Sequence, residues 1–282
     1  MRVRLAIFAL ACLPLAAQDP PANPTLTPGK EAALGRQLAA EFSRTAAPVD
    51  SPLLNDYVRR LGDKLAAFIP DAKSPFTFSV VADEACPLQE PLGLPGGYVV
   101  VPAGLFVAAE DEAEFAGILA HAMEHIARRD WFQSADPKIG AIPLIFLGGG
   151  FGCTTGSLMP VGLLPSRRAS ELAADALAAG VVARAGYDPN GLGRYIARVQ
   201  PQPRQPGTVA KVFTPFPSLE ERLSALSESI AKLPHADSTV VTTGEFVAAR
   251  QEAQHILQQT ADRRLRRAGT GSAEAPSLML KK

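Results

Sequence analysis

The sequence predicts an α+β protein that is mostly helical and carries a small β-sheet. Apolar residues recur at helical spacing in several long stretches of the 282-residue chain, whereas only two short segments have the pattern of a strand. Hydrophobic residues make up 47% of the chain, which is enough for one sizeable core or two small ones. We therefore expect helices to dominate the fold.

The predicted helices are bounded by residues that favour helix ends. Asp50-Ser51-Pro52 is a start signal, Asp111 to Glu114 place acids in a first turn, and Gly186 to Pro189 form a stop signal. These signals and the apolar spacing predict helices at residues 34–42, 53–68, 111–130, 167–185, 219–232 and 244–268.

The two predicted strands precede the helix that begins near Asp111. Residues 76–81 alternate between apolar and polar before turning apolar, which is typical of a half-buried strand. Residues 98–101 are Tyr-Val-Val-Val, a β-branched run that follows a Pro-Gly-Gly turn and ends at Pro102. We expect them to form a small sheet beside the helix.

The N-terminus has the pattern of an export signal. Arg2 and Arg4 flank an apolar run at residues 5–15, and Ala16-Ala17 fits a cleavage site, so residues 1–17 are predicted to be a signal peptide. A lipoprotein signal that is cleaved before an acylated Cys12 is a weaker alternative, because it leaves an apolar run of only about seven residues. We expect the mature protein to be periplasmic or extracellular, where Cys86 and Cys153 could form a disulfide or stay free.

The rest of the chain divides into three parts. A proline-rich tether at 18–28 precedes one domain at 29–268, and a disordered tail follows at 269–282. Residues 139–166 carry no charge, but their glycines and prolines favour a folded-over apolar segment above a transmembrane helix. Membrane contact is therefore the less favoured alternative. With 28 basic and 28 acidic residues, no charge excess points to nucleic acid.

A pair of histidines on the predicted helix at 111–130 indicates a metal site. His121 and His125 are four residues apart, so both imidazoles project from one face, as two zinc ligands on one helical turn do. A later helix carries Glu171 and Asp175 at the same spacing. Glu171 offers the missing third ligand, and Asp175 could accept the outer N–H of a ligating imidazole.

Several motifs, taken in order, resemble metallopeptidase family forty-eight, the gluzincins that include CAAX prenyl endopeptidases and HtpX-like proteases. They are Leu94-Pro95-Gly96-Gly97-Tyr98, the histidine helix, Glu171-Leu172-Ala173-Ala174-Asp175, Ala185-Gly186-Tyr187-Asp188-Pro189, and Pro217-Ser218 with Arg222. The resemblance implies a zincin-like metallopeptidase domain that binds one Zn²⁺ per chain through His121, His125 and Glu171. It also implies a polypeptide substrate.

Four positions depart from the pattern of that family. Its helix motif is His-Glu-x-x-His, in which the glutamate takes a proton from water, but Ala122 stands at that position here. Phe216 occupies a position where the family often has a histidine, and Glu90-Pro91 replaces the usual Asn-Ala. The sequence therefore predicts hydrolysis that is weak or lost.

Glu124 is a candidate substitute for the missing base. The sequence His121-Ala122-Met123-Glu124-His125 also reads as the inverted motif His-x-x-Glu-His. On a helical wheel Glu124 flanks the histidines on the side opposite to position 122, so it could act only if the cleft opened there. The alternative is a surface carboxylate, or one near the metal, paired with Arg128.

Two functions remain open from the sequence. One is a zinc metalloendopeptidase whose substrate adds a strand along residues 97–101; the candidate substrate-binding residues are Gly96, Gly97, Tyr98, Val99 and Val100. The other is a peptide-binding or chaperone-like pseudoprotease that uses the same groove without cleaving. A membrane-embedded protease would require residues 139–166 to span a bilayer.

Overall fold

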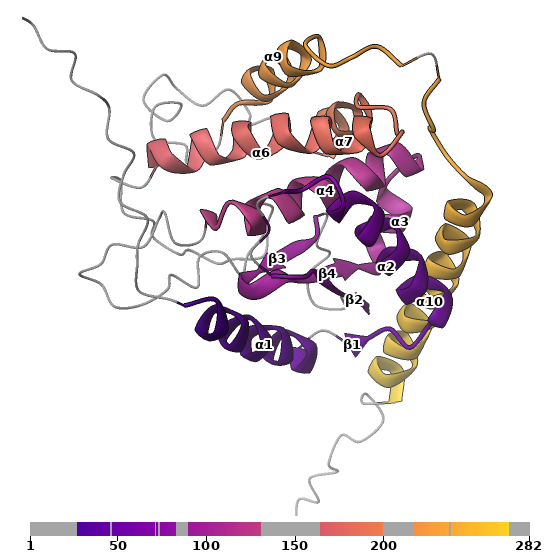
Figure 1. The fold of residues 1–282 in the computed structure, drawn as a ribbon. Helices are drawn as coiled ribbons and strands as arrows, with labels where there is room; N and C mark the ends of the chain where they lie inside the picture. Colours follow the sequence, from indigo (N-terminus) through magenta and orange to yellow (C-terminus); the bar gives the residue numbers. More distant parts are fainter. Residues whose placement is uncertain are drawn as a thin grey trace, which may run out of the picture.

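The computed structural model describes residues 27–45, 47–70, 72, 74–82, 90–130, 164–199, 217–236 and 238–270. Helices surround a small four-stranded sheet, which confirms the predicted fold class (Figure 1). The helices are α1 (Pro28–Thr45), α2 (Pro52–Ala66), α3 (Ala103–Ala108), α4 (Glu112–Ala127), α6 (Leu164–Arg184), α7 (Gly191–Val199), α9 (Leu219–Ile230) and α10 (Gly244–Thr270). The strands are β1 (Ala47–Pro48), β2 (Thr77–Ala82), β3 (Leu92–Leu94) and β4 (Tyr98–Pro102), and a single 3₁₀ turn, η1 (Pro95–Gly97), separates β3 from β4.

The sheet has the strand order β1-β2-β4-β3. The two strands that the sequence predicts, β2 and β4, lie side by side and run parallel, with Phe78 opposite Val99. The short strands β1 and β3 pair antiparallel with β2 and β4 respectively. Since β4 has a hydrogen-bonded neighbour on each side, its backbone cannot accept a substrate strand. The strand addition expected along residues 97–101 thus finds no free edge on β4.

Alternation along the central strands divides the apolar side chains between two cores. Val99 and Val101 point to the large core that α2, α4, α6, α7 and α10 complete. Val81 and Val100 point to the opposite face, where Leu38 of α1 packs against them. The sheet thus lies between α1 on one face and the remaining helices on the other (Figure 1).

The glycines of the Pro-Gly-Gly turn are explained by close packing. Gly96 has a φ of 74°, and a Cβ there would lie 2.4 Å from the Cα of Ala32 in α1. Gly97 has a φ of 94°, and its Cβ would lie 2.1 Å from the carbonyl oxygen of Pro75. Only glycine combines such backbone angles with such contacts. These residues shape the turn between β3 and β4, and nothing in their packing requires a substrate.

The centre of the large core is aromatic. Phe106 of α3 and Phe115 of α4 lie with ring centroids 4.5 Å apart, and Tyr57 and Phe246 complete the cluster at 5.9 and 5.6 Å from Phe115. All four side chains are buried. Because these rings come from α2, α3, α4 and α10, their packing fixes the first half of α4 between the other helices.

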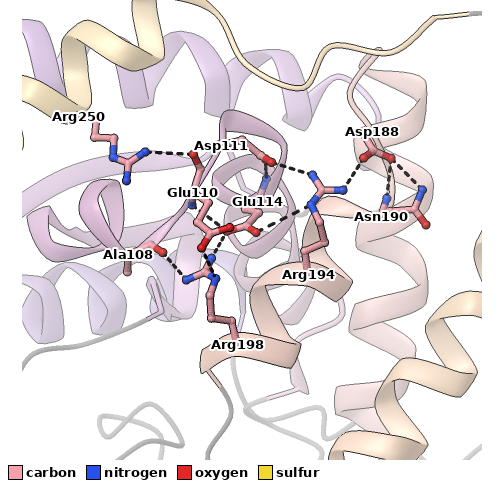
Figure 2. A network of polar contacts seen from close by, with 9 residues as sticks. All are labelled: Ala108, Glu110, Asp111, Glu114, Asp188, Asn190, Arg194, Arg198 and Arg250. Carbon is pink, nitrogen blue, oxygen red and sulfur yellow. Dashed lines mark hydrogen bonds and ion pairs between the residues drawn. The ribbon is translucent and has the colours of Figure 1, made fainter.

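Ion pairs from α7 hold the N-terminus of α4 (Figure 2). Asp111 caps α4 by accepting a hydrogen bond from the Glu114 amide at 2.9 Å. Its other oxygen accepts from Arg194 of α7 at 2.9 Å, and Arg198 pairs with the fully buried Glu114. Arg194 also donates to Asp188 at 2.6 Å. The network fixes the position of α4 along the axis of α7, and with it the position of the two histidines.

Some predicted features lie outside the described residues. These are the signal peptide, Cys12, most of the tether, Cys86, Cys153, residues 139–163, Phe216 and the last twelve residues. Within the described ranges, none of the helices combines the length and the apolar character needed to cross a membrane.

Candidate metal centre

Helix α4 carries both histidines in a buried position. Asp111 caps its first turn, and Glu112 and Glu114 place negative charge near its N-terminus, which the helix dipole favours. Nearly every residue of the helix is buried, and His121 is only 3% exposed. A helix that is buried all round can keep polar side chains only where partners meet them. The partners of the histidines therefore define the site.

The two imidazoles face one another across one helical turn. Nε2 of His125 lies 3.1 Å from Nε2 of His121, and the rings are nearly perpendicular, with centroids 4.6 Å apart. Two nitrogens bound to one tetrahedral zinc ion, each at ~2.0–2.1 Å, would lie about 3.3 Å apart. The arrangement of the Nε2 atoms is thus close to the one that a shared zinc ion requires.

Helix α6 brings Glu171 to the same point. Its Oε2 lies 3.5 Å from Nε2 of His121, and its Oε1 lies 3.7 Å from Nε2 of His125. The potential ligand atoms of the three residues all lie within 4.8 Å of one another. The structure therefore brings together the three ligands that the sequence predicts.

Asp175 and Arg222 support His121 from the side that faces away from the metal site. Nδ1 of His121 lies 2.9 Å from Oδ1 of Asp175, one turn beyond Glu171 on α6. The guanidinium of Arg222, from α9, donates to both oxygens of Asp175 at 2.7 and 2.8 Å. All three side chains are nearly inaccessible to solvent. Asp175 thus lies where the sequence places it, and Arg222 supplies the positive charge that a buried carboxylate needs.

Asp130 gives His125 an equivalent partner, and sequence reasoning missed it. Oδ2 of Asp130 lies 2.8 Å from Nδ1 of His125, and the carboxylate is 4% exposed. Helix α4 ends at Ala127, and Arg129 turns the chain back with a φ of 56°, a conformation uncommon for residues other than glycine. This turn brings Asp130 to the histidine. The only signal in the sequence was an acid just after the end of the helix.

Charges within the cluster shift the protonation of its members. Burial lowers the pKa of His121, but the carboxylates of Asp175 and Glu171 outweigh it and raise that pKa to about 10. Burial raises the pKa of Glu171, but His125 and His121 bring it well below its usual range. The carboxylates of Glu171 and Asp175 are thus ionised beside the two imidazoles. A divalent cation could replace the imidazole protons in the same electrostatic environment.

The tautomers of the histidines fit a metal site. Because Asp175 and Asp130 contact the two Nδ1 atoms, each imidazole presents Nε2 to the centre. A carboxylate on the outer nitrogen is the usual arrangement around a ligating histidine, since it fixes the ring and increases the basicity of the ligand. The donor set of two imidazoles and one carboxylate also leaves a fourth tetrahedral position open.

Ala122 and Glu124 flank the ligands on opposite sides of α4. Position 122 lies about 60° beyond His125 around the helix, and position 124 about 60° before His121. Both side chains are 5% exposed, so Glu124 is no surface carboxylate. Arg128, its expected partner, lies with Nε 3.4 Å from Asp130. Among the described residues, the potential ligand cluster holds His121, His125 and Glu171 and does not include Glu124.

Comparisons with known proteins agree with this geometry. Residues 52–230, which contain the whole cluster, match the model of peptidase family M48. The chain is 26% identical to the putative beta-barrel assembly-enhancing protease of Vibrio cholerae, over 80% of this chain and 51% of that protein. It is 24% identical to the beta-barrel assembly-enhancing protease of Escherichia coli K12, over 72% of this chain and 44% of that protein. The chain thus spans about half the length of these relatives.

Proposed function

Because this chain belongs to peptidase family M48, we propose that it is a zinc-dependent endopeptidase for exported polypeptides, slowed by the alanine at position 122. The observation that carries the proposal is the convergence of His121, His125 and Glu171 in a buried cluster. Each histidine is held from behind by a carboxylate, as ligating histidines usually are. The proposal includes one Zn²⁺ per chain.

The donor set favours a catalytic ion over a purely structural one. Structural zinc sites take four protein ligands, whereas these residues offer three and leave one position for water or substrate. A zinc ion bound there would polarise the carbonyl group of a peptide bond and lower the pKa of a water molecule. Imidazole and carboxylate also bind other divalent ions, so the identity of the metal has to be measured.

The substrate is proposed to bind along β3 instead of β4. Strand β3 is the last strand of the sheet among the described residues, and it lies against α4 at the position of the missing base. An extended peptide that pairs with the outer edge of β3 would gain main-chain hydrogen bonds and pass beside Ala122. This edge replaces the residues of β4 and its preceding turn as the proposed binding surface.

The proposed substrates are polypeptides outside the cytoplasm. The export signal expected at residues 1–17 supports this compartment, and two relatives are named for enhancing the assembly of β-barrels. The balance of 28 basic and 28 acidic residues gives no support for nucleic acid as a partner. Contact with a membrane is a less favoured part of the proposal.

Ala122 supports a second candidate function. A methyl group cannot take a proton from water, and the loss of a general base typically lowers a rate by about 10²–10⁴-fold. A chain that kept the metal and the peptide-binding edge without the base would hold polypeptides without cleaving them. This second candidate is a peptide-binding or chaperone-like pseudoprotease on the same scaffold.

Zinc content and peptide cleavage separate these functions. The purified mature chain is expected to contain close to one zinc ion, and His121→Ala should lose it. Casein cleavage that a chelator stops and zinc restores supports the endopeptidase. A chain that holds zinc and binds casein without cleaving it supports the pseudoprotease, and a chain without metal contradicts both.

Position 122 itself provides the sharpest test of the missing base. Ala122→Glu should raise or create cleavage, because it returns a carboxylate to the family position. Ala122→Gln is the matched control, since it adds the same volume without a proton acceptor. Equal activity in both variants would show that a carboxylate at this position does not limit the rate.

Glu124 needs a separate test because the sequence left it open as a substitute base. Its place on the far flank of the ligands makes it the less favoured candidate. Glu124→Gln should therefore retain cleavage and zinc. Loss of cleavage with the zinc content unchanged would assign the base to Glu124.

A further inference from the structure

A pocket on the opposite side of α4 from the metal centre has no role in the functions described so far. Its volume is about 590 Å³, and it is lined by residues of α2, of the turn after α6, and at the N-terminal ends of α4 and α10. Glu112 of α4 lines it, and Glu112 precedes His121 by nine residues. Nine helical residues place the two side chains about 13 Å apart along the axis and about 180° apart around it. The pocket is therefore separate from the candidate metal ligands.

A buried carboxylate lies in the wall of this pocket. Glu112 is only 3% exposed, and its Oε1 accepts hydrogen bonds from the hydroxyl groups of Tyr57 and Tyr187, each at 3.0 Å. Burial and the charge of Glu112 raise the pKa of both phenols, so both stay protonated as donors. The two tyrosines thus satisfy one oxygen of the carboxylate.

The second oxygen of Glu112 lacks such a donor. Oε2 is buried, and it has no hydrogen-bond partner within the described ranges. Buried polar atoms are normally paired, because an unpaired one loses its contact with water and gains nothing in return. Since Glu112 lines the pocket, a molecule that enters can supply the missing donor.

A positive charge is already held close to this carboxylate. Nζ of Lys64 lies 4.3 Å from the centroid of the Tyr187 ring, which is the geometry of a cation–π contact. The hydroxyl group of the same ring donates to Glu112. Lys64 is exposed where it lines the pocket, so a ligand can displace its ammonium group. The position of Nζ indicates where the pocket stabilises a cation.

The composition of the pocket favours an organic cation over a metal ion. Among the described residues, Glu112 belongs to no group of three potential ligands that could hold a metal. The other carboxylate in the lining, Glu245, is 69% exposed and accepts from Arg60 at 3.1 Å. A volume of this size is typical of sites for small organic molecules. Leu61 and the ring of Tyr187 offer apolar surface for the body of such a molecule.

We propose that this pocket binds an organic primary amine, whose ammonium group donates to Oε2 of Glu112 while its apolar body packs against Leu61 and Tyr187. A carboxylate beside an aromatic ring attracts a cation through both its charge and the ring quadrupole. A primary ammonium group also brings N–H donors, which a quaternary one lacks, and only a donor satisfies Oε2. The site is independent of the proposed endopeptidase function, because none of its residues is a candidate metal ligand.

Benzylamine is the probe, and titration calorimetry on the purified chain measures its binding. Benzyl alcohol has nearly the same shape without the charge and should bind at least about 10-fold more weakly. Benzyltrimethylammonium should also bind more weakly than benzylamine, because it cannot donate a hydrogen bond. Equal binding of the alcohol, or no binding of benzylamine at millimolar concentration, would overturn the proposal.

The primary variant is Glu112→Gln, which keeps an acceptor for the two tyrosines and removes the negative charge. Benzylamine should bind about 10–100-fold more weakly to it. Glu245→Gln is the matched control, since it neutralises an exposed carboxylate of the same pocket and should weaken binding by less than about 5-fold. Equal losses in the two variants would show that general surface charge attracts the amine, which contradicts the role of Glu112.

Lys64→Met tests the site without changing the buried carboxylate. Lys64 is exposed, so the variant should fold even if Glu112→Gln does not, and thermal unfolding checks both. Benzylamine should bind about 2–5-fold more tightly to Lys64→Met, because the ring of Tyr187 loses its resident cation. Unchanged or weaker binding would contradict the proposed position of the ammonium group.

A tripeptide distinguishes two sources of the ammonium group. Phe-Gly-Gly amide with a free amino terminus is compared with its N-acetylated form. Binding of the free tripeptide as tight as that of benzylamine assigns the site to the amino terminus of a peptide, whereas weaker binding assigns it to a free amine. Both outcomes support recognition of an ammonium group. Equal binding of the acetylated and free tripeptides would contradict it.

Discussion

Arg222 of α9 and Asp175 of α6 form a buried two-pronged ion pair behind the metal centre. Its hydrogen bonds measure 2.7 and 2.8 Å, and the same carboxylate reaches 2.9 Å from Nδ1 of His121. Burial raises the pKa of Asp175, but Arg222 and His121 lower it below its usual value. One guanidinium thus keeps the partner of a candidate ligand, His121, charged.

We predict that Arg222→Met destabilises the protein and weakens zinc binding together. Removing one member of a buried ion pair typically costs about 3–5 kcal/mol, because the other charge stays buried alone. The zinc affinity should also fall, by about 10–100-fold, since His121 loses a well-oriented partner. Urea unfolding and chelator competition measure the two effects. Arg168→Met is the control, because its partner Glu221 is more exposed and such pairs contribute about 1 kcal/mol or less.

A second prediction concerns Asp130, the residue that sequence reasoning missed. Asp130→Ala should lower the zinc affinity by about 10–100-fold, because His125 is no longer held with Nε2 toward the centre. Asp130→Asn can keep one contact and should lose less. An unchanged affinity in both variants, measured by competition with a chelator, would show that α4 alone orients His125.

At two glycines of α7, we predict that substitution by alanine has opposite effects on stability. A Cβ on Gly191 would lie 2.4 Å from the backbone of Ala113, so Gly191→Ala should push α7 away from α4 and destabilise by about 1–3 kcal/mol or more. A Cβ on Gly193 would lie 3.4 Å from Leu226, an ordinary contact. Gly193→Ala should stabilise the helix by up to about 1 kcal/mol. Thermal unfolding of both variants checks this pair.

Asp188, in the turn before α7, should make the stability of the protein depend on pH. Burial raises the pKa of Asp188, but Arg194 and Asn190 outweigh it and lower that pKa below its ordinary value. A carboxyl group whose pKa is lower in the folded state stabilises the protein above its unfolded pKa of about 3.9. That contribution is lost as the pH falls through the folded pKa.

Asp188→Asn should therefore reduce the free energy of unfolding at neutral pH and match the wild type in strong acid. The reduction should be about 1 kcal/mol, because Arg194 is partly exposed and solvent screens the pair. Asp56→Asn serves as the control, since its pair with Arg59 is more than half exposed on both sides. A difference that persisted below the folded pKa would have to come from the amide and not from the charge.

The sequence predicted what depends on local patterns. Helical spacing located the segments that became α2, α4, α9 and α10, and the four-residue spacing of His121 and His125 put both rings on one face. It missed β3, because Leu-Gly-Leu is too short to show alternation, and α7, because two glycines obscure its pattern. It also predicted substrate binding along β4, because the sequence does not show that β4 is an inner strand. Strand order depends on pairing between segments that are far apart in the chain.

The same limit applies to the candidate site. Candidate metal ligands can be recognised by residue type and spacing, so Glu171 could be predicted as a ligand before the fold was known. The contribution of Asp130 depends on one left-handed residue, Arg129, and that of Arg222 on how α9 docks.

The link from α4 through α6 to α9 also has a consequence for folding kinetics. The ligands and their support come from segments far apart in the chain, so the site forms only after long loops have closed. We therefore expect zinc to be captured in the same slow phase in which α9 docks, and not during early collapse. In a refolding reaction, the uptake of metal would mark the moment at which α9 reaches its place.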